Sequence, residues 1–431
     1  MADSIVDGPL VMGTQQQYFV RNSRLKQGVE GTSMNYVFVG TEGAPESSPT
    51  GQVTTEDSTP AVAAKPYLIE EDGVWSILVP KLVKGSVGPL SSSQDDTVVP
   101  MSQVYVARPG DTARTINTGI QGMRALLITP AVYDLNGTVV ITESNFVVLG
   151  LGFATLVSRN GHSALQVSEN AAGVRVAGVL FESGSALKAD AISSPLVEWA
   201  GPDGVASDLF TRAGSFSNSP SRCLQVRQDV HARIGGDGVV VDNTWMWHAD
   251  HDDCGGASDG AFSGNGLVVQ GRNVVAYGLK VEHMMRNLVE WYGENGETYL
   301  YQSELPYHAP TFNGVGYYVH PSVRSHKALA IGVYIVGDLI AQTGIRVPPT
   351  ANLKNAFAWV ITGAHSQFHS VVCTNTSTCY FGQRCTYNAC YQYELPQVLK
   401  GGGVGSLPRP ALSEDRSGYS TGGEGYLPEF A

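Results

Sequence analysis

Short runs of β-branched and aliphatic residues that end in a carboxylate or an amide recur along this chain. They occur at residues 179–182, 239–243, 279–283 and 299–304, and a weaker copy follows at residues 334–338. In the later part of the chain the matching points are about 25 to 30 residues apart, and larger gaps mark inserted loops. Such an interval is typical of solenoid coils, so the pattern predicts a parallel β-helix.

The same pattern predicts where the polar ends of these runs lie. Each coil of a parallel β-helix places its strand about 4.8 Å from the strand before it. Side chains at equivalent positions therefore form a column along one face, and we expect this column to contain Glu182, Asp242, Glu282, Gln302 and Glu304. Like charges at this spacing are unfavourable unless they are paired, protonated or used in chemistry. The column is a candidate site, although solvated side chains on an outer face would give the same pattern.

The hydrophobic pattern divides the chain into three parts. Residues 1–105 are the least regular and contain short strands at 67–69 and 74–79, which we interpret as an arm folded along the solenoid. Residues 106–395 carry the repeat. Residues 396–431 include a run of glycines and are expected to be weakly ordered.

One helix is predicted at the start of the repeat. Residues 113–127 have apolar side chains at helical spacing, including Ile116, Ile120 and Met123. A short helix at this point would cover the open end of the β-helix and shield its unpaired strand edge. The predicted fold class is therefore all-β: a single-stranded parallel β-helix with loop insertions and a short capping helix.

Composition and charge narrow the class of partner. Fifty glycines and only 15% charged residues suit turn-rich β structure, and the formal net charge is -12. Phosphate binding relies on clustered Lys and Arg, so nucleic acid and anionic membranes are not expected as partners. No apolar run is long enough to cross a bilayer. A neutral or cationic partner is favoured.

Cysteines and glycosylation motifs favour an extracellular or cell-wall glycoprotein. Four of the six cysteines cluster near the C-terminus, beside an N-glycosylation motif at Asn375, and a second motif begins at Asn136. The clustered residues are Cys373, Cys379, Cys385 and Cys390. This clustering favours disulfides, although a zinc site or buried free thiols would also use such residues. The first five residues lack the features of a signal peptide, so we interpret the sequence as a mature or trimmed secreted chain.

Several motifs resemble a known family. Residues 108–113 before the predicted helix, together with 149–156, 241–251 and 302–307, resemble right-handed β-helix proteins of the pectate-lyase-like superfamily. Within it the chain is most similar to the secreted carbohydrate-active branch that includes glycoside hydrolase family fifty-five, the β-1,3-glucanases. The resemblance implies a right-handed β-helix that acts on a polysaccharide. That family joins two β-helices in one longer chain, so we interpret residues 8–19 as the last coils of a shortened first helix.

The acidic column offers the chemistry of glycoside hydrolysis. This reaction needs a protonated carboxyl group that assists the leaving group and a second group that manages water. We predict Glu304 as the acid, because Tyr301 and Tyr307 give it a half-apolar setting that raises a carboxyl pKa. Glu282 or Asp242 would then hold or activate the water.

Aromatic and amide side chains near the same level are predicted to bind the sugar. Amphipathic rings beside carboxylates are typical of saccharide sites, although Tyr and Trp also pack well in β cores. The predicted set is Trp245, Trp247, Trp291, Tyr301, Gln302 and Tyr307.

Residues 247–254 form the densest polar stretch of the chain. Asp250 and His251 from it are predicted to contact substrate, while a Ca²⁺ or Zn²⁺ site and a plain loop remain alternatives. His283 follows Glu282, and strand alternation points the two to opposite faces unless the strand ends there. The glycine-rich run 149–153 leads into a strand instead of a helix, so no nucleotide or other organic cofactor is expected.

Two other functions remain open from the sequence. A polysaccharide lyase would use the same fold but would have to hold an acidic uronate polymer, which an acidic groove disfavours. A non-catalytic structural or carbohydrate-binding solenoid would keep the aromatic side chains without the acid. If the chain is shortened, a partner chain or a homo-oligomer would complete the site.

Overall fold

The computed structural model describes the greater part of the chain. The described residues are 1–13, 17–31, 35–48, 53–91, 93–184, 191–214, 226–250, 261–307, 309–361, 366–374, 378–380 and 391–393. The predicted substrate residue His251, the cysteines Cys385 and Cys390, and the tail predicted over residues 396–431 lie outside these ranges.

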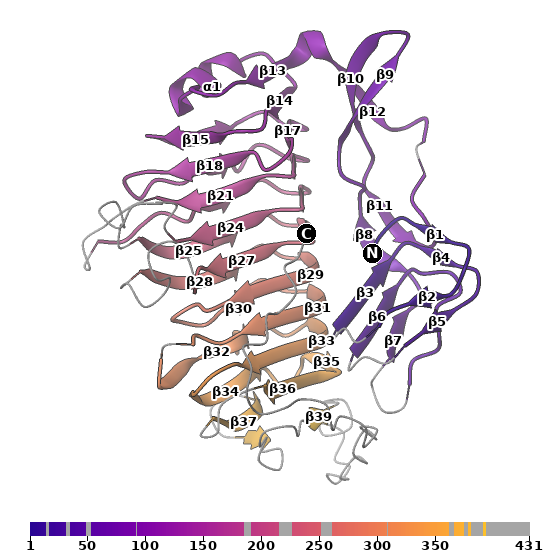
Figure 1. Cartoon of the computed structure of the whole chain (residues 1–431), viewed down its shortest axis with the longest axis vertical. Helices are drawn as coiled ribbons and strands as arrows, with labels where there is room; N and C mark the ends of the chain where they lie inside the picture. The colour runs from indigo at the N-terminus through magenta and orange to yellow at the C-terminus, as the bar shows by residue number, and fades with distance from the viewer. Residues whose placement is uncertain are drawn as a thin grey trace, which may run out of the picture.

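Two long sheets form the body of the molecule (Figure 1). Among the described residues, the larger sheet has 17 strands and the smaller has 10. The larger sheet comprises β13 (Val104–Ala107), β14 (Ala125–Ile128), β15 (Val132–Leu135), β17 (Val147–Gly150), β18 (Thr155–Ser158), β20 (Arg175–Ala177), β21 (Leu180–Ser183), β23 (Val205–Ser207), β24 (Phe210–Ala213), β26 (Val240–Asp242), β27 (Trp245–His248), β29 (Val275–Glu282), β31 (Gly296–Glu304), β33 (His326–Ile335), β35 (Asn352–Lys354), β36 (Ala356–Val360) and β39 (Tyr391–Tyr393). The smaller sheet comprises β16 (Val139–Ile141), β19 (Leu165–Val167), β22 (Val197–Trp199), β25 (Arg227–Ile234), β28 (Phe262–Val269), β30 (Val289–Trp291), β32 (Thr311–Val319), β34 (Ile340–Val347), β37 (Gln367–Thr374) and β38 (Thr378–Tyr380).

The strands stack as the coils of a β-helix. Pairing is parallel throughout both sheets until the last pairs, β36 with β39 and β37 with β38, which are antiparallel. In the larger sheet the early coils form two separate ladders, and these merge in β29, whose single strand spans both. The predicted fold class, a right-handed single-stranded parallel β-helix, is confirmed.

One residue per coil turns the chain between the two ladders of the larger sheet. The parallel register aligns these corner residues, and each has a left-handed backbone. The φ angles are 50° at Asp208, 51° at Asn243, 57° at Gly278, 63° at Leu300 and 58° at Ala330. Asp, Asn and Gly tolerate this conformation well. Leu300 and Ala330 are apolar because the N-terminal part of the chain packs on them.

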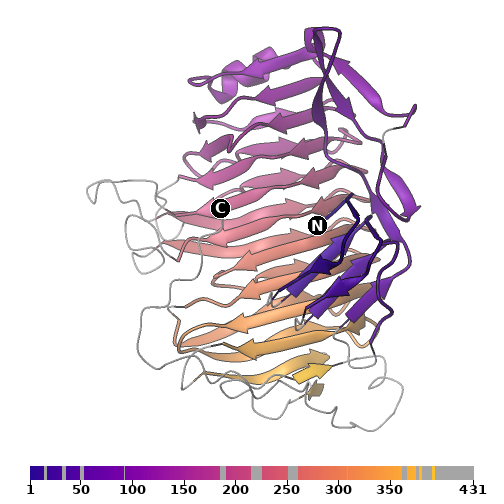
Figure 2. The same ribbon diagram turned by 45° about the vertical axis from the view of Figure 1, so that its right-hand side comes forward.

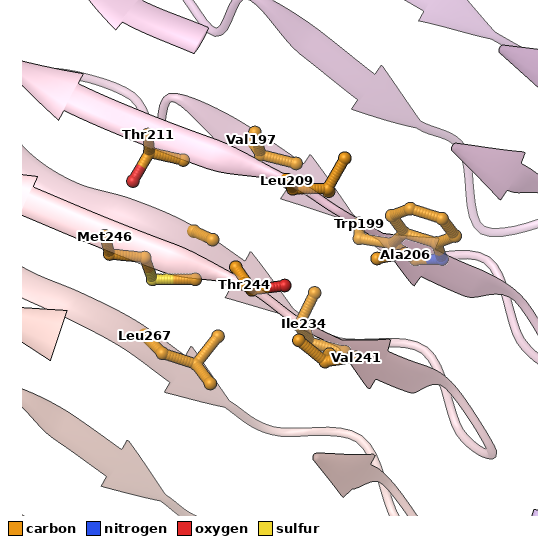
Figure 3. A pocket seen from close by; sticks show the side chains of 11 residues that line it. Val197, Trp199, Ala206, Leu209, Thr211, Ile234, Val241, Thr244, Met246 and Leu267 are labelled. Carbon is orange, nitrogen blue, oxygen red and sulfur yellow. The ribbon is translucent and has the colours of Figure 1, made fainter. Parts of the chain in front are cut away.

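Aliphatic side chains fill the interior between the walls. A small cavity of about 10 Å³ remains there, lined by apolar side chains such as Trp199 and Leu267, with Thr211 and Thr244 as its polar members (Figure 3). A volume of this size has room for about one water molecule. The cavity is therefore a packing void, and the chemistry of the protein must lie on an outer face.

Helix α1 (Ala113–Gly119) covers the first coil. The hydroxyl of Thr112 accepts a hydrogen bond from the backbone N–H of Thr115, which caps the helix, and Ile116 is fully buried. The predicted end of this helix at residue 127 is wrong, because Ala125–Ile128 pairs into the larger sheet as β14. Among the described residues no helix is long and apolar enough to cross a membrane.

The first hundred residues are more regular than predicted. Parallel pairs join β1 (Ile5–Val6) to β4 (Arg24–Leu25) and β2 (Leu10–Val11) to β5 (Val29–Glu30). Parallel pairs also join β3 (Gln17–Arg21), β6 (Asn35–Val39) and β7 (Val53–Glu56). The predicted short strands at 67–69 and 74–79 are present as β9 (Tyr67–Glu71) and β10 (Val74–Val79), which pair with each other and with β12 (Thr97–Pro100). The remaining elements are β8 (Thr59–Val62), β11 (Val83–Ser86) and a 3₁₀ helix at Met101–Gln103.

Strand β3 attaches this N-terminal part to the β-helix (Figures 1 and 2). Its alternate side chains contact successive coils: Arg21 bonds to Asp242, Phe19 stacks on Tyr277 at 6.3 Å, and Gln17 bonds to the carbonyl of Tyr301 at 3.3 Å. Because the contacts follow one strand, β3 crosses the coils along the solenoid axis. The N-terminal part therefore borders one edge of the outer face described below.

A column of four glycines lies where neighbouring coils approach one another closely. Gly201, Gly236, Gly271 and Gly293 each follow a strand of the smaller sheet, and a Cβ atom added at Gly236 would lie 1.9 Å from the carbonyl oxygen of Gly201. We expect Gly236→Ala to lower the free energy of unfolding by about 3 kcal/mol, because the backbone must shift.

Gly235 offers a matched control for this substitution. A Cβ atom there would meet nothing closer than 3.6 Å, so Gly235→Ala should change the free energy of unfolding by less than about 1 kcal/mol. Chemical denaturation measures both variants. Equal stability of the two would contradict the steric argument.

Candidate active site

Glu282 and Glu304 lie side by side on an outer face of the larger sheet. In the parallel register Trp247 of β27 pairs with Glu282 of β29, which pairs with Glu304 of β31. The same column continues in the other direction through Arg212 to Glu182. The structure therefore aligns Glu182, Glu282 and Glu304 in one column, as the repeat predicts.

Glu182 has a structural role in this column. Its side chain is fully buried, and Arg212 Nη1 donates to its Oε1 at 2.8 Å. The guanidinium of Arg212 also lies 5.4 Å from the ring centre of Trp247. This ion pair stabilises the strands that precede Trp247 in the column. Glu282 and Glu304 are therefore the two glutamates of the column that are available for chemistry.

Asp242 does not belong to the column. It aligns with Tyr277, before the corner residue of its coil, whereas Glu282 comes after the corner. Its carboxylate is buried and accepts a bond from Arg21 Nε at 3.2 Å, and Arg21 also reaches Asp3 at 3.1 Å. The predicted catalytic role of Asp242 is therefore wrong, because this carboxylate anchors the N-terminal part.

A second column runs beside the first, two residues earlier in each strand. Trp245 pairs with Lys280, and Lys280 pairs with Gln302. Since alternate residues of a strand share a face, these side chains flank the carboxylates. Burial lowers the pKa of Lys280, and the charges of Glu282 and Asp208 oppose this shift.

Glu304 is surrounded by hydrogen-bond donors. The hydroxyl of Tyr307 donates to Glu304 Oε2, and the amide of Gln302 donates to Oε1 at 3.4 Å. His283 Nε2 lies 3.6 Å from Oε2, on the inner side. The side chain of Glu304 keeps 23% of its surface exposed, so it remains accessible to a ligand.

Glu282 holds a proton more strongly than an ordinary carboxyl group. Burial and the charge of Glu304 raise the pKa of Glu282 to about 7, although His283 and a hydrogen bond from Trp245 act in the opposite direction. Glu282 therefore retains its proton up to near-neutral pH.

His283 is a site residue that the sequence did not identify. Strand β29 ends at Glu282, and His283 has a left-handed backbone with φ 64°, so strand alternation does not apply to it. Its buried imidazole lies beside Glu304, with Nδ1 3.2 Å from the carbonyl oxygen of His248. The ring of Tyr307 packs against it at 4.2 Å between centres. Only its position after a strand end, next to Glu282, could have indicated this.

Asp250 reaches the same cluster from the end of β27. Trp247 Nε1 donates to Asp250 Oδ1 at 3.1 Å, and the same oxygen lies 3.5 Å from His283 Nδ1. The structure thus brings Asp250 to the carboxylate pair through His283. Its predicted neighbour His251 is outside the described residues.

The aromatic side chains of this face stack on one another. Phe210 and Trp245 lie 4.7 Å apart at 17°, and Trp245 and Trp247 lie 5.7 Å apart. Rings stacked in this way expose their edges. The indole N–H of Trp245 donates to Glu282, and that of Trp247 donates to Asp250. Trp245 is 36% exposed, so a ligand can reach the end of the stack nearest the carboxylates.

Two predicted substrate residues are wrong. Trp291 and Tyr301 are both fully buried in the core. Tyr301 precedes Gln302, whose side chain points outward, so alternation turns Tyr301 inward, where its hydroxyl donates to the carbonyl of Gly316 at 2.7 Å. Neither ring can contact a ligand on the outer face.

The face is filled on the far side of Glu304. On the next coil Gly332 follows Gln302 and Tyr334 follows Glu304. A Cβ atom at Gly332 would lie 2.9 Å from Gln17 Oε1, and the hydroxyl of Tyr334 donates to that same oxygen at 3.2 Å. Tyr334 and Phe357 are buried there. The carboxylate pair therefore lies at one end of the exposed part of the face.

Metal binding gains no support within the described residues. No group of three or more His, Cys, Asp or Glu side chains in them is placed to hold a metal ion. The Asp252 and Asp253 carboxylates of the Ca²⁺ alternative lie outside the described ranges. The chemistry below is derived from side chains alone.

The fold and the site define a parallel β-helix protein with two neighbouring glutamates, Glu282 and Glu304, on the outer face of its larger sheet. The profile of the LAM55 pectate lyase-like domain matches residues 104–304, a segment that ends at Glu304. An exo-beta-1,3-glucanase of Streptomyces sp. (strain SirexAA-E / ActE) is 33% identical over 403 residues, which is 86% of this chain and 63% of that protein.

Two solved structures of sacteLam55A from Streptomyces sp. SirexAA-E extend the comparison. A variant in complex with glucose superposes with a TM-score of 0.75 at 30% identity, covering 88% of this chain and 72% of that chain. A second structure has a TM-score of 0.75 at 31% identity, covering 86% of this chain and 70% of that chain. The chain therefore belongs to the LAM55 β-helix family, glycoside hydrolase family fifty-five. It spans 63% of the length of the Streptomyces exo-beta-1,3-glucanase.

Proposed function

We propose that this protein is a glycoside hydrolase that cleaves β-1,3-glucan. The observation that carries the proposal is the Glu282–Glu304 pair, in which the pKa of Glu282 is raised and the side chain of Glu304 is accessible. The similarity to an exo-beta-1,3-glucanase supports the reaction and the neutral substrate.

Glu304 is the general acid in this proposal. It is the accessible member of the pair, and a sugar that covers it would remove water and so favour the protonated carboxyl group. Its proton passes to the glycosidic oxygen as the bond to the anomeric carbon breaks. Glu282, when ionised, orients the attacking water and accepts its proton. Before the next turnover Glu282 must release this proton and Glu304 must regain one.

The filled end of the face supports attack from a chain end. The space beyond Glu304 is taken by Gln17 and Tyr334, so within the part of the chain that the structure describes a glucan would extend toward Trp245. We expect Gln17→Ala to shift the products of β-1,3-glucan from the shortest sugar toward longer oligosaccharides. Chromatography of early products measures this.

The control for this substitution is Gln27→Ala. Gln27 lies on the same N-terminal part, is exposed, and donates to the carbonyl of Asp7 at 2.8 Å. Its substitution should leave the product pattern unchanged. Identical patterns for wild type and Gln17→Ala would reject Gln17 as the wall.

The substrate class is tested by a panel of polymers. The protein is incubated with β-1,3-glucan, with β-1,4- and β-1,6-glucans, and with uronate polymers, while reducing ends and ultraviolet absorbance are followed. Reducing ends from β-1,3-glucan alone support the proposal. A rise in absorbance from a uronate polymer would instead identify a lyase, and binding without cleavage of any polymer would identify a carbohydrate-binding solenoid.

We also propose an extracellular or cell-wall location with disulfide bonds and N-linked glycans. The position of Cys373 opposite Cys379 in the antiparallel pair of β37 and β38 supports a disulfide in this part of the chain. Asn136 is exposed between β15 and β16, where a glycan would be tolerated. Mass spectrometry of the protein secreted from a glycosylating host checks both modifications. A partner chain or homo-oligomer that completes the site stays a prediction.

A further inference from the structure

His283 lies behind the proposed acid, on the side away from solvent. Its side chain is only 3% exposed, and Nε2 lies 3.6 Å from Glu304 Oε2. Tyr307 donates to the same oxygen, whereas Oε1 accepts from the half-buried amide of Gln302. Oε2 is therefore the inner oxygen of Glu304, and Oε1 is the oxygen that a sugar can reach.

The imidazole is held in one orientation. Its φ of 64° is a conformation that costs energy for a residue with a side chain, although His tolerates it better than most. The backbone N–H of His283 donates to the carbonyl of Glu304 at 2.8 Å. Nδ1 faces both the carbonyl of His248 at 3.2 Å and Asp250 at 3.5 Å, so Nδ1 carries a hydrogen and Nε2 points at Glu304.

Acidic groups face His283 from each strand packed against it. They are Glu282 at the end of β29, Asp250 after β27, and Glu304 at the end of β31 with the Tyr307 hydroxyl after it. Burial lowers the pKa of His283, but the contact with Glu304 and the charges of Asp250 and Glu282 raise it by more. These acidic neighbours therefore favour the protonated form of the imidazole in the free protein.

We propose that His283 is a positioning residue that stores the proton and delivers it to Glu304 when a sugar covers the site. This inference rests on the proposed glycoside hydrolysis. The Nε2 proton of the imidazolium passes to Glu304 Oε2, which leaves a neutral carboxyl group and a neutral imidazole whose Nδ1–H still donates to the His248 carbonyl. Because Oε2 is the inner oxygen, the carboxyl group must then turn to bring its O–H to the glycosidic oxygen. After turnover Glu304 is ionised again, and the imidazole regains its proton at Nε2 from solvent, on the Glu304 side, once the product has left.

The physical cause is loss of water from an ion pair. An isolated ion pair in a low-dielectric setting is costly, and a carboxylate–imidazolium pair can remove that cost by transferring one proton. Glu304 keeps 23% of its side chain exposed before a ligand arrives, and a bound sugar would cover it. Binding therefore favours the neutral pair, so the acid is loaded when substrate is present.

The first test is the pH dependence of β-1,3-glucan hydrolysis by His283→Asn. Asn tolerates the left-handed backbone and can donate to His248, but it stores no proton. We expect the alkaline limb of kcat to move down by about one pH unit, so that kcat at pH 8 falls about tenfold while kcat at pH 5 changes little. Asp250→Asn should shift the limb in the same direction by less. His320→Asn, outside this cluster, is the matched control.

A second measurement does not depend on turnover. In protein labelled at histidine, the imidazole signal that is missing in His283→Asn is titrated by NMR. Its midpoint should lie above the ordinary value of about 6.5 and should fall by about one pH unit in Glu304→Gln, because the carboxylate charge is removed. Adding glucose should lower the midpoint in the wild type.

The outcomes separate this inference from the proposed function. If no β-glucan is hydrolysed, the proposed function fails, and the titration still reports whether His283 holds a proton against Glu304. Loss of kcat by one factor at every pH in His283→Asn, or a midpoint that is unchanged in Glu304→Gln, would overturn the storage role and leave a purely structural histidine.

Discussion

Glu304→Gln is expected to lower the rate of β-1,3-glucan hydrolysis by about 10³-fold, with the fold unchanged. Glutamine keeps the shape of the side chain but cannot donate a proton to a leaving oxygen, and general acid catalysis contributes about 10² to 10⁴-fold. Glu304 is partly exposed and is not a core residue, so thermal unfolding should move little. Initial rates of reducing-end release, with circular dichroism of both proteins, measure the two effects.

The control for this prediction is another glutamate of the β-helix. Glu143 is exposed, lies between β16 and β17, and is remote in sequence from the carboxylate pair. Glu143→Gln should retain the wild-type rate. If Glu304→Gln also retains the wild-type rate, Glu304 is not the acid. If the rate of Glu304→Gln is restored by a glucan with an activated leaving group, the assignment of Glu304 as the acid is supported.

Glu282→Gln separates the two members of the pair. The charge of Glu304 helps to raise the pKa of Glu282 to about 7, so the two groups respond to each other. If Glu282 manages the water, the hydrolysis rate of Glu282→Gln should stay low with an activated leaving group. The rate of Glu304→Gln should instead recover with that substrate, because such a leaving group needs no acid. This contrast assigns the roles without relying on absolute rates.

The coils could be predicted because their signal is local. Alternation within each run fixes which residues point inward, and the interval between runs places Glu282 next to Glu304. The same alternation, applied strictly, would have turned Tyr301 inward as the neighbour of Gln302. The inward orientation of Tyr301 is therefore predictable from the sequence.

Asp242 was misassigned for a different reason. The run at residues 239–243 ends at a corner residue, Asn243, whereas the run at 279–283 begins after the corner residue Gly278. The two runs look alike but lie in different ladders of the larger sheet. The left-handed corner residue between the ladders is Asn in one coil and Gly in the next, so it is not recognised by residue type. Apolar Leu300 and Ala330 take the same conformation, so residue type alone does not mark the corner.

The remaining site features depend on contacts distant in sequence. Gln17 meets Tyr301 and Ala330 across 284 and 313 residues, and Arg21 meets Asp242 across 221. Nothing in the local pattern of β3 indicates which coil it will cross. His283 joins the site through its backbone conformation, which the strand pattern around Glu282 does not predict.

Arg21→Met is expected to be the most destabilising single change on the surface between β3 and the coils. Side-chain exposure is 6% for Arg21 and 10% for Asp242, so removing the arginine leaves a carboxylate buried without its partner. Such a change typically costs about 3 to 5 kcal/mol. Chemical denaturation should show the loss, and hydrogen exchange should rise first in β3 and β6, since these strands lose their anchor on the coils.

The ion pair itself need not be the most stable solution. Replacing both partners, as in Arg21→Met with Asp242→Leu, removes the buried charge together with its counter-ion and should restore most of the lost stability. Arg24→Met provides the control, because the Arg24–Glu42 pair is exposed, at 48% and 38%, and its loss should be far smaller. If Arg21→Met unfolds like Arg24→Met, or if the double variant is no better than the single one, Asp242 is not held by Arg21 in the way described. Retention of β-1,3-glucan hydrolysis by the double variant would at the same time separate Asp242 from the chemistry of Glu282 and Glu304.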